Sequence, residues 1–128
     1  MTLEERIGAT LAVGFHGTEA TSELVEGLRR MHARNLVVFS RNFTSPGQFV
    51  ALLRGLEDGL GRGLLVIVDH EGGCIIRFAS GVTRFPDALT VRRTQSPAAI
   101  ERLGAVEAEE LMPLGLQINL APCVDVIN

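Results

Sequence analysis

The chain alternates short apolar runs with longer amphipathic stretches. The apolar runs, which predict buried strands, are Leu11–Phe15, Leu36–Phe39, Leu64–Val68 and Leu116–Leu120. They are nearly continuous rather than alternating, as expected where both faces of a parallel sheet are covered. Strand–helix alternation of this kind indicates parallel pairing with right-handed crossovers, and therefore the α/β fold class.

Helices are expected in the amphipathic stretches between these runs. The first follows the hydroxyl-bearing segment Thr18–Ser22 and is expected to end near Asn35. Two others are expected to begin at Ser45 and Ser96, each of which precedes a proline. In this arrangement the serine caps the helix, and the proline stands where no backbone donor is missed.

A length of 128 residues suits one domain. Four strand–helix units are half of an eight-stranded TIM barrel, which typically needs ~250 residues. We therefore expect residues 1–128 to form a single incomplete domain, a partial (β/α)8 barrel that looks cut short. The first and fourth strands would keep unpaired edges, and inner-face residues such as Leu65, Ile67 and Ile118 would be wetted in a monomer, so self-association is expected.

Composition narrows the possible functions. The net charge of −3 and the absence of a basic stripe argue against nucleic acid and anionic membranes as partners. All 12 basic side chains are arginine, which excludes Schiff-base and phosphate-loop lysine chemistry. Cys74 and Cys123 lack the close pairing of a zinc site and stand in apolar contexts, so we expect reduced, buried thiols. No signal-peptide run is present, which makes a cytoplasmic location the default expectation.

Functional groups of parallel α/β folds collect at the carboxyl ends of the strands. The polar residues at those positions are Arg41, Asn42, Asp69, His70, Glu71, Arg77, Asn119 and Asp125. Asp125 follows a proline that makes a regular strand improbable beyond Leu120, so it is expected in a loop near the mouth. A role for Asp125 as a turn or backbone cap is at least as well supported as a ligand role.

The segment from Asp69 to Gly73 is the most unusual, because three ionisable residues directly follow an apolar run. If the strand continues, Asp69 and Glu71 share a face and the two glycines allow a sharp turn beside a ligand. The alternative, equally weighted, is that Asp69 caps the loop and Glu71 pairs with Arg77 or Arg84. A metal ion is disfavoured, because adjacent strand residues such as His70 point to opposite faces.

Taken together, several motifs resemble the N-terminal barrel of glycoside hydrolase family 3, in the branch of the bacterial β-N-acetylhexosaminidases. The motifs are Gly14–Thr18, Phe39–Asn42, Val68–Gly73, Arg84–Pro86 and Asn119–Val126. That branch releases N-acetylglucosamine from cell-wall muropeptides during recycling. No metal or other cofactor is expected for this chain. The resemblance spans essentially the whole chain in the family's order.

The resemblance implies that Asp69 and Arg77 hold the terminal sugar, since a carboxylate accepts from hydroxyls and a guanidinium donates through a fixed fork. Arg41, Asn42, His70, Glu71 and Asp125 are further candidates to line the site. His70 stands where the family usually has Gln, and Cys74 where it commonly has Arg.

The family's nucleophilic aspartate and its histidine acid/base belong to the later half of the barrel and have no counterpart in this chain. The expected function is therefore the sugar-binding half of a retaining glycosidase, with no catalytic residue of its own. The alternatives are a non-catalytic or vestigial half barrel that binds sugar or a partner and, more weakly, a phosphate-binding α/β domain.

Overall fold

The computed structural model describes residues 1–125. In chain order its helices and strands are α1 (Leu3–Gly8), β1 (Ala12–Gly14), α2 (Ser22–Arg30), β2 (Asn35–Val38), η1 (Ser40–Asn42), α3 (Pro46–Leu60), β3 (Leu65–Val68), α4 (Ala88–Thr94), α5 (Pro97–Leu111), η2 (Met112–Leu114) and β4 (Ile118–Asn119). The strands form one four-stranded sheet in the order β1-β2-β3-β4. Every neighbouring pair is parallel, which confirms the α/β fold class.

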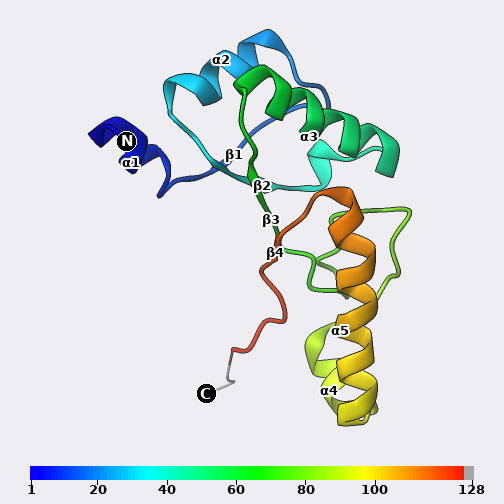
Figure 1. Cartoon of the computed structure of the whole chain (residues 1–128). Helices are drawn as coiled ribbons and strands as arrows, with labels where there is room; N and C mark the ends of the chain where they lie inside the picture. Colours follow the sequence, from blue (N-terminus) through cyan, green and yellow to red (C-terminus); the bar gives the residue numbers. More distant parts are fainter. Residues whose placement is uncertain (126–128) are drawn as a thin grey trace.

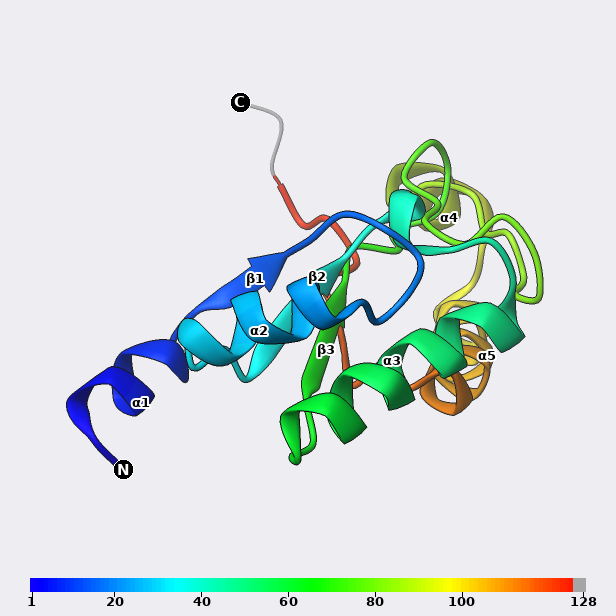
Figure 2. The same cartoon turned by 90° about the horizontal axis from the view of Figure 1, so that it is seen from above.

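The helices α2 and α3 pack together on one face of this sheet, and α5 lies beyond them on the same side (Figures 1 and 2). We call this side the covered face. The side chains of β2 and β3 that point to it are Leu36, Val38, Val66 and Val68, each at most 2% exposed. Phe49 of α3 is completely buried in the same core and contacts the rings of Phe43 and Phe78. The apolar stripes of the helices therefore supply one continuous core.

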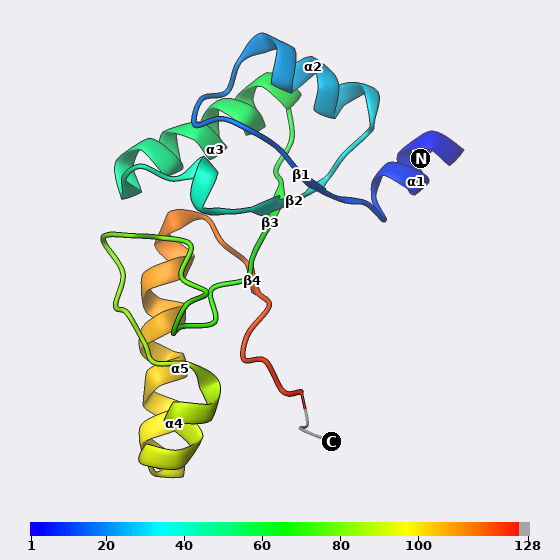
Figure 3. The ribbon, with the colours of Figure 1, turned by 180° about the vertical axis from the view of Figure 1, so that it is seen from behind.

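The opposite side, which we call the open face, has no helix against it in the described part of the chain (Figure 3). Leu65 of β3 and Ile118 of β4 are 38% and 37% exposed there, and Ile67 is partly exposed. This confirms that these inner-face positions are wetted in a single chain. It also corrects the prediction that both sheet faces are covered, because the apolar runs fill one face only.

The predicted helix starts at Ser45 and Ser96 are confirmed. The Ser45 side chain accepts a hydrogen bond from the Gln48 backbone at 3.2 Å, and the Ser96 side chain accepts one from Ala99 at 3.3 Å. The predicted end of the preceding helix near Asn35 is wrong.

Helix α2 ends at Arg30, and the chain then reverses through His32, which has a φ of 50°. Asn35 belongs to β2, where it pairs with Ala12 of β1, and its side-chain amide donates to the carbonyls of Ala9 and Leu11, both at 2.9 Å. This contact fastens the start of β2 to the segment that leads into β1.

Two helices were not anticipated. In α1, Thr2 and Glu5 form a reciprocal capping box, and Asp87 caps α4 by accepting from Thr90. The prediction of buried thiols is wrong: Cys74 and Cys123 are both free and exposed, since each lies in a loop outside the core. No helix within residues 1–125 is long and apolar enough to cross a membrane.

Candidate functional site

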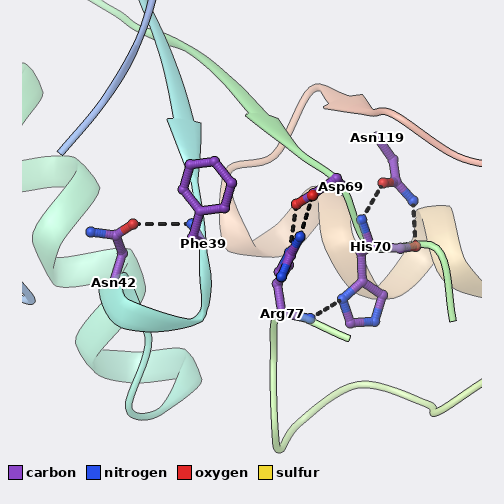
Figure 4. A network of polar contacts seen from close by, with 6 residues as sticks. All are labelled: Phe39, Asn42, Asp69, His70, Arg77 and Asn119. Carbon is purple, nitrogen blue, oxygen red and sulfur yellow. Dashed lines mark hydrogen bonds and ion pairs between the residues drawn. The ribbon is translucent and has the colours of Figure 1, made fainter. Parts of the chain in front are cut away.

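The candidate site lies at the carboxyl edge of the sheet, where β2 and β3 end side by side. Val38 and Val68 are paired in the register, so Phe39 and Asp69 follow at the same level. The inward–outward alternation of β3 continues for two residues beyond the strand. Asp69 keeps a side chain that is 24% exposed, whereas His70 is 1% exposed. Figure 4 shows both residues together with Arg77.

Asp69 and Arg77 form a two-pronged ion pair. Arg77 Nε donates to Asp69 Oδ1 at 2.6 Å, and Arg77 Nη2 donates to the second carboxylate oxygen, Oδ2. These bonds to Arg77 hold the pKa of the Asp69 carboxyl below its ordinary value of 3.8 and raise the pKa of Arg77. The pair is therefore charged at neutral pH. A carboxylate has about four acceptor positions and a guanidinium five donors, so both keep capacity for a polar ligand.

An aromatic ring lies beside this pair. The guanidinium carbon of Arg77 is 5.5 Å from the centroid of the Phe39 ring, and that of Arg41 is 4.5 Å away. Arg41 is also held by its Nε, which donates to the Phe15 carbonyl at 2.8 Å. Gly14 lies directly beside both groups, since a Cβ there would be 3.4 Å from the Arg41 guanidinium and from the Phe39 ring. Two cations thus flank one apolar ring at the edge of the open face.

His70 points the other way, to the covered face, where its ring stacks on Phe78 with centroids 5.5 Å apart. Its Nδ1 accepts from the Arg77 backbone N–H at 3.1 Å. Asn119 of β4 bonds both backbone groups of His70, and its amide nitrogen also donates to Glu107 of α5 at 3.0 Å. Burial raises the pKa of Glu107. These side chains therefore lie behind the Asp69–Arg77 pair, on the covered side of the strand end.

Two other sequence candidates, Glu71 and Asp125, lie in irregular segments beyond the strand ends. The strand does not continue to Glu71, whose backbone N–H instead donates to Ile75 in a tight turn. The condition under which Asp69 and Glu71 would share a face is therefore not met, because β3 ends at Val68. Glu71 lines a mainly apolar cavity of about 130 Å³ between α4, α5 and Pro122. Asp125 is exposed and follows β4 in an irregular segment.

Asn42, another candidate to line the site, does not line it, because its side chain is completely buried. Its amide nitrogen donates to the carbonyls of Phe15 and Gly17 at 3.2 and 3.0 Å, and its Oδ1 accepts from the Phe39 backbone at 3.0 Å. Asn42 therefore ties the loop after β1 to the end of β2, and through that loop it fixes the position of Phe39.

The turn after Glu71 depends on glycine. Gly72 and Gly73 have φ values of 85° and 57°, which side chains rarely adopt. A Cβ on Gly72 would also lie 2.5 Å from the Pro86 carbonyl oxygen, and the Gly73 N–H donates to the Phe85 carbonyl at 2.8 Å. The close approach of these backbones closes the loop that carries Arg77.

The sequence predicted Asp69 and Arg77 as site residues but not the ion pair between them, and it did not predict Phe39 or Glu107 as parts of the arrangement. Phe39 could have been found, since it stands two positions before Arg41 at a strand end and alternates with the buried Val38. Glu107 gives no such signal, because only the packing of α5 brings it to Asn119. Among residues 1–125, no three His, Cys, Asp or Glu side chains gather in a way that could hold a metal ion.

Comparison with known proteins identifies relatives over nearly all of the chain. The profile of the "Glycosyl hydrolase family 3 N terminal domain" matches residues 2–128. A "Beta-hexosaminidase" of Idiomarina loihiensis is 33% identical over 122 residues, which are 92% of this chain and 37% of that protein. The chain therefore spans little more than a third of the length of this curated relative.

Solved structures agree with this assignment. A glycoside hydrolase family 3 β-N-acetylglucosaminidase from Paenibacillus superposes with a TM-score of 0.87 at 27% identity, over 95% of this chain and 24% of that one. NagZ from Neisseria gonorrhoeae, in complex with N-trifluoroacetyl-D-glucosamine, gives a TM-score of 0.73 at 27% identity, over 85% of this chain and 35% of its own. The four-stranded sheet is thus part of a domain of the TIM-barrel type.

Proposed function

Because the chain belongs to glycosyl hydrolase family 3, whose N-terminal domain it matches over residues 2–128, we propose that it supplies the sugar-binding part of a retaining β-N-acetylhexosaminidase site. The substrate class is a glycan with a terminal N-acetyl-β-glucosamine. Asp69 and Arg77 hold the hydroxyls of that sugar. The nucleophile and the acid/base that break the bond come from polypeptide outside these residues.

The observation that carries this proposal is the Asp69–Arg77 pair at the carboxyl edge of the open face (Figure 4). In barrels of this type, ligands meet the carboxyl ends of the strands. The carboxylate accepts from sugar hydroxyls, and the guanidinium donates to sugar oxygens with its remaining N–H groups. Phe39 adds an apolar surface beside them, as sugar and small-molecule sites generally combine a few polar groups with aromatic rings.

Two relatives support the sugar class. The curated relative from Idiomarina is a β-hexosaminidase, and the Neisseria structure holds an N-acylated glucosamine analogue. We extend this to cell-wall muropeptides as the natural glycan and to the cytoplasm as the location, on the resemblance to the bacterial recycling enzymes. Fractionation of cells that produce a tagged protein, with the tag found in the periplasm, would count against the cytoplasmic location.

The deciding experiment compares variants of the longest natural polypeptide that contains this chain. Asp69→Asn and Arg77→Met should each lower kcat/KM on an aryl N-acetyl-β-glucosaminide about ten- to hundredfold, because each removes a charged hydrogen bond to the sugar. Asp58→Asn, an exposed carboxylate on α3, is the matched control and should leave kcat/KM unchanged. Unchanged kinetics in both site variants would reject the proposal.

A second measurement concerns the 128-residue chain by itself. It should not turn over the same substrate, because it contains neither the nucleophile nor the acid/base of the family's reaction. Steady turnover by the pure chain, abolished by Asp69→Ala, would show that these residues are sufficient and that the division of the site is wrong.

A further inference from the structure

His70 links Asp69 to Arg77 in two ways: it follows Asp69 in the chain, and its side chain binds the Arg77 backbone. It directly follows Asp69, whose carboxylate binds the Arg77 side chain, and its own Nδ1 accepts from the Arg77 backbone N–H at 3.1 Å. One strand end therefore holds Arg77 at two points, at the guanidinium and at the backbone. Arg77 lies in an irregular loop, so the backbone contact decides where its side chain begins.

The His70 ring itself is firmly fixed. It is 1% exposed and stacked on Phe78, which is completely buried. The Asn119 side chain accepts a hydrogen bond from the His70 backbone N–H at 2.8 Å and donates one to the His70 carbonyl at 3.1 Å. Through these two bonds, β4 fixes the His70 backbone. With its backbone and its stacking face both held, the ring offers Nδ1 to Arg77 in one orientation.

We propose that His70 is a positioning residue for the sugar: its neutral ring holds the Arg77 backbone through Nδ1, and a proton on that nitrogen releases the loop and weakens sugar binding. This inference rests on the proposed function of the Asp69–Arg77 pair. It assigns His70 no contact with the sugar. It makes sugar binding sensitive to acid through a group that lies behind the site.

The surroundings of His70 favour the neutral ring. Burial is the main cause that lowers the pKa of His70 below its ordinary 6.5, and the Arg77 charge lowers it further. Asp69 and, from α5, Glu110 act in the opposite direction. Glu107 faces the His70 backbone through Asn119. Because Nδ1 accepts a hydrogen bond, the ring proton must be on Nε2, which is buried without a hydrogen-bond partner among the described residues.

Two substitutions separate the ability of residue 70 to accept a hydrogen bond from its ability to take up a proton. In His70→Asn, the side-chain oxygen can occupy the place of Nδ1 and accept from Arg77, but it does not titrate. In His70→Phe, a ring of similar size can still stack on Phe78, but it accepts nothing. Both are made in the longest natural polypeptide that contains this chain, and the wild-type protein is measured alongside.

The first measurement needs no sugar. The NMR protection factor of the Arg77 backbone amide is followed between pH 7.5 and pH 5, together with the ¹⁵N shifts of the His70 ring. We expect an Nε2–H ring in the wild type and a protection factor that falls as the ring becomes protonated. In His70→Asn the protection should persist in acid, and in His70→Phe it should be low throughout. The inference would be overturned if the protection factor of the Arg77 amide changed neither with pH nor in His70→Phe.

The second measurement is the pH profile of KM and kcat on an aryl N-acetyl-β-glucosaminide. His70→Phe should raise KM about three- to tenfold, the usual effect of one neutral hydrogen bond, with a smaller change in kcat. His70→Asn should restore the wild-type KM and remove its rise in acid. If the Arg77 amide responds as expected but Asp69→Asn and His70→Phe both leave KM unchanged, the proposed function fails and the backbone contact is only structural. If Asp69→Asn alone raises KM, the proposed function holds and this inference fails.

Discussion

The two faces of the sheet differ in what they do for the molecule. On the covered face, Val66 and Val68 of β3 are 2% and 0% exposed, in one core with residues of α2 and α3. On the open face, their neighbour Leu65 is 38% exposed. The same alternation then divides Asp69, which faces the open side, from the buried His70. The covered face therefore holds the fold together, whereas the open face leaves apolar side chains exposed to solvent in the described chain.

Matched leucines on neighbouring strands provide the sharpest test of this difference. Leu36 of β2 is completely buried on the covered face, whereas Leu65 of β3 is on the open face. Leu36→Ala should lower the free energy of unfolding by about 2–5 kcal/mol, since it removes buried contacts and leaves a cavity. Leu65→Ala should lower it by less than about 1 kcal/mol, because part of that side chain is already in water. Equal shifts in urea midpoint would show that the open face is covered in solution.

The open face also predicts association. The edges of β1 and β4 have no partner strand in the described chain, and Leu65 and Ile118 are exposed between them. We propose that the isolated chain self-associates through this face. Replacing both residues with serine should weaken association at least about tenfold, because burying each apolar side chain contributes roughly 1 kcal/mol or more.

Sedimentation equilibrium at micromolar concentration measures this effect. A matched double replacement of Leu3 and Ile7, which are exposed on α1 away from the sheet, should leave association unchanged. A compact wild-type monomer that melts cooperatively and binds no hydrophobic dye would contradict the proposal.

Acid should act on the covered side of the strand end through His70. Its pKa is lowered in the folded state, mainly by burial, so the unfolded chain binds the proton more readily. The neutral His70 ring therefore makes its full contribution to the free energy of unfolding above pH 6.5, the ordinary pKa. That contribution declines as the pH falls below 6.5, by at most about 1.4 kcal/mol per pH unit for one proton. Urea unfolding at pH 7.5 and pH 5.5 should show a larger decline in the wild type than in His70→Asn. A decline of the same size in both would assign the effect to other groups.

The open side of the strand end should show the smallest effect on stability. The pKa of Asp69 is lowered by Arg77, so the pair stabilises the fold above about pH 3.8 and loses that contribution as the pH falls further. Because the pair is partly exposed, Asp69→Asn should cost at most about 1 kcal/mol in the free energy of unfolding at pH 7. Thermal or urea unfolding checks this value. A loss as large as that of Leu36→Ala would mean that the pair is part of the core.

Local chemistry made much of the fold predictable. Ser45 and Ser96 cap their helices through contacts with residues three positions away, and apolar runs marked all of the strands. The prediction for Asn35 failed because its partners, Ala9 and Leu11, belong to a distant segment. The prediction that both cysteines are buried failed for a related reason, since apolar neighbours in the sequence do not reveal whether a loop packs into the core.

The candidate site divides in the same way. Asp69 and Arg77 were predicted from a motif, and the structure pairs them. The buried role of Asn42 and the contact between Glu107 and Asn119 were not predictable, because both depend on how separate elements pack. Sequence patterns identified the polar residues of the site and the opposite orientation of Asp69 and His70, but not the contacts that separate elements make around them.

The crowded glycine turn has a consequence for genetics. Any amino-acid substitution of Gly72 adds a Cβ that would lie 2.5 Å from the Pro86 carbonyl oxygen. The φ of this residue is also one that residues with side chains rarely adopt. In a saturation mutagenesis library selected for sugar cleavage, Gly72 should therefore be as intolerant as Asp69, although Gly72 needs no contact with the sugar. Intolerance at this codon would record the shape of the loop, and a map of essential codons alone would not distinguish it from chemistry.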